Sequence, residues 1–186
     1  VYFRYEGDPS ALLRLGTLED VFVLLARARV DTGRAGRAQV AELAARADGF
    51  EPALNALRRV RPRRVRQVTF RVVVQRPTGR YAYVRQEVGR RVARAVEKRF
   101  ARWKQVPEDA TLELWVLQRG PDTTLGMRLS DRTMRHRTYK VASRPASLRP
   151  VVARAMVRCS APGDDDVFLD PMCGAGTILI ERGEHG

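Results

Sequence analysis

The chain has 186 residues, enough for one ordinary domain or two small ones, and its 44% of hydrophobic residues excludes wholesale disorder. Lysines and arginines number 35 against 21 acids, a formal net charge of +14, and such an excess in a folded protein is typical of contact with a polyanion, above all nucleic acid. Two cysteines and two histidines exclude a disulfide framework and a zinc-ligand cluster.

The first two thirds of the chain predict alternating short helices and strands. A strand remnant at 1–6 comes first, and the chain then reads as a helix at 10–15, a strand at 21–29, helices at 37–47 and 52–60, a strand at 68–75, a helix at 84–103 and strands at 112–117 and 125–129. Val68, Phe70, Val72 and Val74 alternate along the strand at 68–75, and Pro77 predicts its end.

The last third predicts the opening of a different kind of domain. A linker at 144–148 leads to a helix from Pro150 to about residue 158, and a short buried strand at 167–169 then enters a glycine-rich turn. No apolar run approaches the roughly 18–20 residues that span a bilayer. The chain starts on Val1 in strand-like sequence without a signal peptide. We therefore expect a cytoplasmic protein with no membrane partner and a cut N-terminal end.

The positive charge is concentrated in blocks. Residues 58–104 carry 17 cations and 2 acids, and residues 119–158 carry 10 and 2, whereas residues 1–57 are near neutral and residues 159–186 are acidic. A uniform preference for arginine does not produce this distribution. The blocks favour a true anion-binding face.

The predicted helix at 84–103 carries two opposed stripes at intervals of four residues. The apolar stripe consists of Val88, Val92, Val96 and Phe100, and the cationic stripe consists of Arg90, Arg94, Lys98 and Arg102. Stacked cations repel each other unless a polyanion lies along them, although a solvated outer face is the plain alternative. The helix follows six arginines at 58–66, so we predict RNA contacts at Arg63, Arg64 and the cationic stripe. Phe70, Phe100 and Trp115 fall at core phases, which predicts no base-stacking platform.

The sharpest local signal is the glycine loop at 170–177, which reads Asp-Pro-Met-Cys-Gly-Ala-Gly-Thr and leads into an apolar helix. Gly174 and Gly176 permit positive φ or close approach of a ligand, and the free N–H groups that begin the helix favour an anionic group. Asp170, at the end of the strand, can accept a hydrogen bond from an ammonium group. The loop lacks the Lys-Ser/Thr of a phosphate-binding P-loop and the third glycine of a dinucleotide fold. A purely structural turn between a strand and a helix, without a ligand, remains an alternative interpretation.

The longer string from Asp170 to Glu181 closely resembles the first cofactor motif of class I methyltransferases that carry a THUMP domain and modify the exocyclic amine of guanosine in tRNA or ribosomal RNA. Residues 126–132, 137–140 and 144–150 look like the passage from THUMP into the catalytic domain. Residues 1–7 and 17–21 look like an N-terminal ferredoxin-like module. The resemblance implies an α+β front of a ferredoxin-like module (1–50) and a THUMP domain (51–143), followed by the beginning of an incomplete Rossmann-like methyltransferase domain (144–186).

The resemblance also implies a cofactor and a partner. S-adenosylmethionine would lie beside Asp170, Pro171, Cys173, Gly174, Gly176 and Thr177, and the basic front would hold RNA, in this family typically the acceptor end of tRNA. We expect a monomer without metal. The family's ribose-binding acid and its Asp/Asn-Pro-Pro-Tyr loop come later than Gly186, so no catalytic residue is assigned and the 186-residue chain is expected to be inactive and not to bind the cofactor. A non-catalytic THUMP-type RNA-binding module and a 23S rRNA guanine-N2 methyltransferase remain the alternatives to a tRNA enzyme.

Overall fold

The structure, a computed structural model, describes residues 1–62, 67–139 and 147–184. These residues form two compact units, and each is described by itself. One unit is Phe22–Leu129, and the other combines Val1–Val21 with Ser130–Gly186. The fold is mixed α/β with a mixed sheet, as the alternation of helices and strands predicts.

The unit at 22–129 is built on one five-stranded sheet in the order β1-β5-β4-β2-β3. Its strands are β1 (Phe22–Arg29), β2 (Thr69–Thr78), β3 (Lys104–Gln105), β4 (Leu112–Arg119) and β5 (Asp122–Arg128). β5 pairs antiparallel with β1 and β4, whereas β2 pairs parallel with β3 and β4. A parallel pair needs a crossover, and a helix between β2 and β4 supplies it.

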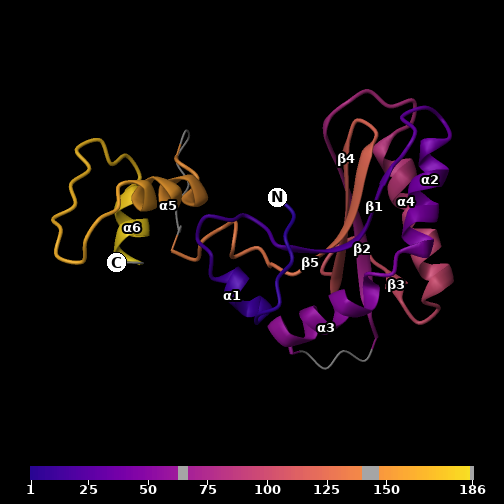
Figure 1. Cartoon of the computed structure of the whole chain (residues 1–186), viewed down its shortest axis with the longest axis horizontal. Coiled ribbons are helices and arrows are strands. Elements are labelled where there is room, and N and C mark those ends of the chain that lie inside the picture. Colours follow the sequence, from indigo (N-terminus) through magenta and orange to yellow (C-terminus); the bar gives the residue numbers. More distant parts are fainter. Residues whose placement is uncertain (63–66, 140–146, 185–186) are drawn as a thin grey trace. The chain divides into compact units, whose positions relative to one another are not determined.

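Two helices of this unit, α2 (Gly36–Arg46) and α4 (Arg85–Arg99), pack side by side on the same side of the sheet (Figure 1). Val88, Val92 and Val96 of α4 are fully buried, so the predicted apolar stripe is confirmed along the helix. The sheet contacts α4 chiefly through β2 and α2 through β1, and alternate residues of β4, Leu112, Leu114 and Val116, are buried. The third helix, α3 (Phe50–Val60), contacts β1.

Two predicted boundaries in this unit are wrong. α4 ends at Arg99 rather than at residue 103, because Trp103 stacks on Phe100 with ring centroids 4.3 Å apart and the chain turns there toward β3. β2 runs past Pro77 to Thr78, because its register against β4 shifts between Gln75 and Thr78 and a bulge tolerates proline.

The described residues of the second unit contain three helices. α1 (Pro9–Leu13) begins after Asp8, whose Oδ1 accepts a hydrogen bond from the Ser10 amide at 3.0 Å. α5 (Pro150–Cys159) also has proline in its first position and packs against α6 (Thr177–Gly183). α1 and α5 confirm the helices predicted from these start signals.

The strands predicted at 167–169 and 1–6 are absent from the structure. Val167 is 98% exposed and Leu169 is 81% exposed, which is the opposite of the predicted burial. A strand is stabilised by hydrogen bonds to a neighbouring strand, and the described residues of this unit contain no other strand. The apolar run alone therefore does not form sheet structure. The predicted domain boundaries stay a prediction. β1 lies in the predicted segment 1–50 and β5 in the predicted segment 51–143, and these two strands pair in one sheet.

Candidate functional site

The glycine loop has two residues in the left-handed region. Gly174 has φ +57° and Gly176 has φ +69°, and Gly176 directly precedes α6. A Cβ added at Gly176 would meet nothing within 4 Å, and at Gly174 the nearest atom is the Met172 carbonyl oxygen at 3.9 Å. The backbone conformation therefore requires glycine here, and the space beside both residues is open to a ligand.

Asp170 begins the loop and fixes its first turn. Its Oδ1 accepts a hydrogen bond from the Met172 amide at 3.0 Å, while its other carboxylate oxygen has no such bond to a described residue. Pro171 and Cys173 are exposed, and the Cys173 thiol is free. Thr177, the first residue of α6, is only 5% exposed. The structure thus brings the six predicted cofactor residues together in one continuous turn, with Thr177 as its buried end.

A buried carboxylate one helical turn after Thr177 organises this part of the chain. Glu181 has no exposed surface, accepts a hydrogen bond from the Tyr139 hydroxyl, and lies 3.4 Å from Arg137 Nε. Its backbone carbonyl accepts a hydrogen bond from Arg154 Nη1 at 2.8 Å. We name these four residues the Glu181 cluster.

Burial raises the pKa of Tyr139 well above its ordinary value, and the hydrogen bond to Glu181 raises it further. The tyrosine therefore keeps its proton and donates a hydrogen bond to the carboxylate. The sequence did not reveal this cluster, since its local signal is just one acid, Glu181, directly after the apolar stretch Ile178–Ile180.

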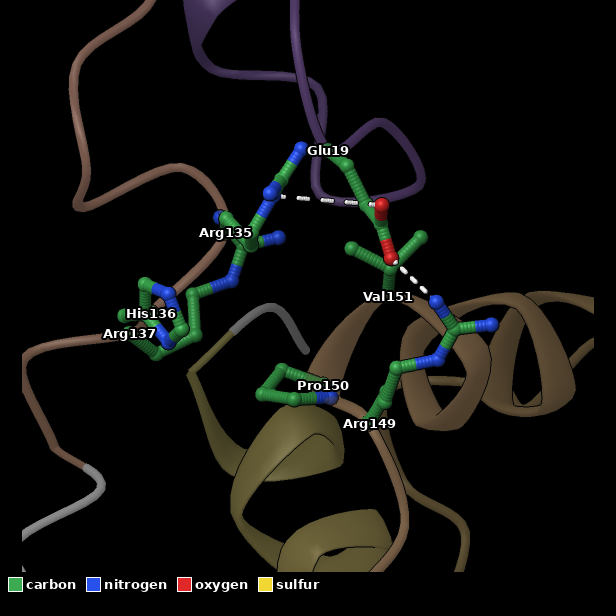
Figure 2. Close-up of a pocket in the computed structure, with 7 residues that line it drawn as sticks. All are labelled: Glu19, Arg135, His136, Arg137, Arg149, Pro150 and Val151. Atoms are coloured by element: carbon green, nitrogen blue, oxygen red, sulfur yellow. Dashed lines mark hydrogen bonds and ion pairs between the residues drawn. The ribbon is translucent and has the colours of Figure 1, made fainter. Parts of the chain in front are cut away.

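A cavity of about 330 Å³ in the same unit is lined by Glu19, Arg135, His136, Arg137, Arg149, Pro150 and Val151. Figure 2 shows Arg135 and Arg149 reaching Glu19, at 3.9 Å and 2.7 Å. Arg135 also binds Asp20, and Arg137 belongs to the Glu181 cluster. Because each arginine that lines it has an acidic partner, the cavity is lined by ion pairs rather than by cations free to bind an anion.

The cationic stripe lies on the surface of the 22–129 unit. Arg90, Arg94 and Lys98 are exposed on α4, and none of them forms a hydrogen bond or ion pair with another described residue. Arg102 is also exposed and unpaired among the described residues, but it lies beyond the helix end. Arg63 and Arg64 lie outside the described residues.

Neighbouring cations of the same unit behave differently. Arg37 and Arg91 both pair with Glu87, at 2.9 Å and 3.7 Å, and Arg99 donates a hydrogen bond to the Ala45 carbonyl at 2.9 Å. The acids and carbonyls of this unit therefore engage these three cations, whereas Arg90, Arg94 and Lys98 have no such partner among the described residues. Arg85 of the same helix is also exposed without a described partner, so the four-residue spacing rather than the lack of pairing defines the stripe.

The sheet face away from the buried β4 residues carries a polar and aromatic cluster that sequence analysis missed. Glu113 accepts hydrogen bonds from Arg71 at 2.6 Å, Arg128 at 3.1 Å and Trp115 Nε1 at 3.0 Å. The prediction of Trp115 as a core residue was wrong: it is half-buried and contacts Phe22 with ring centroids 5.2 Å apart. The alternation of β4 could have revealed this, because Leu114 and Val116 point the other way.

Burial alone would raise the pKa of Glu113, but its hydrogen bonds from Trp115 and Arg128, together with the charges of Arg71 and Arg128, lower that pKa below the ordinary value. The carboxylate is therefore ionised and fully engaged in structural bonds.

Metal ligands and membrane-spanning helices are both lacking among the described residues. Among the described residues, no three His, Cys, Asp or Glu side chains gather in a way that could hold a metal ion. None of the helices in the described parts of the chain has the length and apolar character to cross a membrane.

Comparisons with known proteins point to one group. Residues 137–186 match the UPF0020 family model, described as an RMKL-like methyltransferase domain. A tRNA (guanine(6)-N2)-methyltransferase of Thermus thermophilus is 34% identical over 116 residues, which are 61% of this chain and 33% of that protein. A U6 snRNA (guanine-N(2))-methyltransferase, THUMPD2 of Mus musculus, is 34% identical over 120 residues, 63% of this chain and 22% of that protein.

Solved structures agree on the fold. The crystal structure of TrmN from Thermus thermophilus matches 99% of this chain and 50% of its own, with a TM-score of 0.75 and 24% identity. SMU.472, a putative methyltransferase complexed with SAH, matches 88% of this chain and 41% of its own, with a TM-score of 0.60 and 15% identity. The chain thus spans a fifth to a third of the two curated relatives and at most half of these two solved chains.

Proposed function

We propose that the chain is the RNA-holding front and first cofactor-binding element of an S-adenosylmethionine-dependent methyltransferase that modifies the exocyclic N2 of guanosine in RNA, first of all tRNA. The observation that carries this proposal is the geometry of the glycine loop, inside the segment that matches a methyltransferase family model. The similarity to named guanine-N2 methyltransferases of tRNA and snRNA supports the reaction and the class of substrate.

The loop fits the methionine part of the cofactor. Two left-handed glycines with open space at their Cβ positions let a ligand approach the backbone at 174–176. The carboxylate oxygen of Asp170 that makes no bond to a described residue can accept a hydrogen bond from the cofactor's ammonium group, while its partner oxygen holds the turn. When bound, S-adenosylmethionine supplies the methyl group that a guanosine amine receives. Pro171, Cys173 and Thr177 complete the proposed contact set.

The cationic stripe is the proposed RNA-binding surface of the 22–129 unit. Arg90, Arg94, Lys98 and Arg102 are exposed and make no ion pair with a described residue, so their full charge is available to a phosphate backbone. The acceptor region of tRNA is the proposed ligand, with the protein acting as a cytoplasmic monomer. The proposed organisation is the ferredoxin-like module, THUMP domain and start of a Rossmann-like domain stated above, at 1–50, 51–143 and 144–186.

A second RNA class has specific support. The mouse relative is named for U6 snRNA, so a small nuclear or other structured RNA is the alternative substrate of the same chemistry. A 23S rRNA substrate and a purely RNA-binding module stay as the alternatives from sequence.

The test is a methyl-transfer assay with purified protein, radiolabelled S-adenosylmethionine and transcripts of tRNA, U6 snRNA and 23S rRNA fragments. We expect label in N2-methylguanosine of tRNA in a form of the protein that extends beyond Gly186, and none with the 186-residue chain. Label in U6 or 23S RNA alone would change the substrate, and label in no RNA while RNA still binds would favour the non-catalytic module.

A further inference from the structure

We propose that Glu181 is a positioning residue: through the Glu181 cluster it fixes α6, and with it the glycine loop that α6 follows. This inference rests on the proposed methyltransferase function. It assigns a role to a residue that belongs to none of the predicted cofactor contacts.

The cluster joins segments that are distant in sequence. Tyr139 lies 42 residues before Glu181 and Arg154 lies 27 residues before it, yet both donate hydrogen bonds to it. Arg137 adds an ion pair to the carboxylate and also donates a hydrogen bond to the Gly16 carbonyl at 2.6 Å. Two separate stretches of this unit, at 137–139 and at Arg154, therefore meet α6 at Glu181, and Arg137 ties them to a third at Gly16.

The position of Glu181 on the helix links the cluster to the loop. Thr177 and Glu181 are four residues apart, so they share one face of α6, and both are buried. The Ile180 amide donates a hydrogen bond to the Gly176 carbonyl at 3.0 Å, which ties the last loop residue to the turn that carries Glu181. A displacement of this turn therefore displaces Gly176.

Apolar packing alone holds α6 weakly in this chain. Leu179 is 38% exposed and Ile180 is 37% exposed, so two of its large apolar side chains are only partly covered. The carboxylate of Glu181, by contrast, has no exposed surface, and a buried charge persists only where its partners stay in place. The cluster thus fixes the helix through directional bonds, which set its rotation as well as its distance.

The first test is amide hydrogen exchange on the 186-residue chain. Gly176, Ile180 and Glu184 amides are hydrogen-bonded and report on the loop end and α6. We expect Glu181→Ala to speed their exchange about tenfold or more, with the amides of β4 and β5 unchanged. Glu181→Gln keeps an acceptor for Tyr139 and is expected to restore most of the protection. The matched control is Val157→Ala, which removes buried apolar atoms of α5 outside the cluster.

Three outcomes of this experiment overturn the proposal. One is exchange of the three amides in Glu181→Ala within about twofold of the original chain. Another is the same acceleration in Val157→Ala, which would indicate general destabilisation. The last is an exchange rate in the double variant Tyr139→Phe/Glu181→Ala that equals the product of the two single effects. If both residues act through one cluster, the double variant should exchange at the same rate as Glu181→Ala alone. If Glu181→Ala fails to fold, the double variant Glu181→Gln/Tyr139→Phe decides, because it also removes the Tyr139 donor: the same amides are expected to lose protection in it and to keep most of it in Glu181→Gln alone.

A second arm connects the cluster to the cofactor. In a form of the protein that binds S-adenosylmethionine, Glu181→Ala should raise its Kd about tenfold while the Kd for tRNA stays within about twofold. Equal loss of both affinities, or of neither, overturns the positioning role. If no form binds S-adenosylmethionine, the proposed function fails, and the exchange experiment still tests the cluster by itself.

Discussion

Charge reversal on α4 tests the cationic stripe most sharply. Arg90→Glu with Arg94→Glu replaces two exposed cations that have no partner in the part of the chain that the structure describes, and lowers the formal net charge from +14 to +10. The substitutions should not unfold the protein, because neither side chain is buried and Arg94→Glu places an acid four residues before Lys98, where the two form a favourable pair. Any loss of RNA binding is therefore a loss of contacts rather than of structure.

The magnitude follows from counterion release. Each lost phosphate contact lowers the slope of log affinity against log salt by about 0.7 on single strands and about 0.9 on a duplex, so two lost contacts lower it by about 1.4–1.8. The ratio of original to variant affinity should consequently be about tenfold larger at 50 mM than at 200 mM salt. Fluorescence anisotropy with labelled tRNA over this salt range measures both quantities.

The matched control is Arg29→Glu with Arg46→Glu, which has the same change of charge in the same unit. These arginines are ion-paired, with Asp122 at 4.0 Å and with Glu42 at 2.6 Å. If the control loses as much affinity and slope as the stripe variant, net charge explains the binding and the stripe has no special role. An unchanged slope in the stripe variant refutes the assignment directly.

Three further predictions concern stability. Leu114→Ala removes a fully buried side chain and should lower the free energy of unfolding in urea by about 2–5 kcal/mol. Gly176→Ala places a side chain at φ +69° and should destabilise the second unit by about 1–2 kcal/mol in thermal melts, whereas Gly183→Ala, without positive φ or a close neighbour, should be near neutral. The folded state lowers the pKa of Glu113, so the ionised side chain stabilises the fold above the pKa of the unfolded state, and this stabilisation is lost as the pH falls through the pKa of the folded state. Glu113→Gln should therefore flatten the decline of the free energy of unfolding on acidification below about pH 4.5.

The sequence predicted best those elements whose burial follows from local periodicity. The four-residue spacing of Val88, Val92 and Val96 identifies the buried face of α4, because residues at this interval lie on one side of a helix and all three are buried. The start of α5 was equally predictable, since proline in the first helical position is a local signal. The positive φ of Gly174 and Gly176 was likewise predictable from local sequence.

The features that were missed depend on contacts between distant residues. The end of α4 is set by the stacking of Trp103 on Phe100, which periodicity does not contain. Glu181 and Tyr139 are 42 residues apart, and only the folded chain brings them together. The apolar run at 167–169 reads as a strand, but a strand needs a neighbour that local sequence cannot supply.

The proposed function of this protein is guanine-N2 methylation of RNA. The most direct measurement is mass spectrometry of nucleosides from tRNA of cells that lack the gene, compared with cells that carry it. We expect N2-methylguanosine to disappear from one tRNA position and to return when the gene is restored, but not when the restored gene carries Gly174→Trp with Gly176→Trp in the glycine loop. Unchanged N2-methylguanosine in tRNA, U6 snRNA and 23S rRNA of the deletion cells would contradict it.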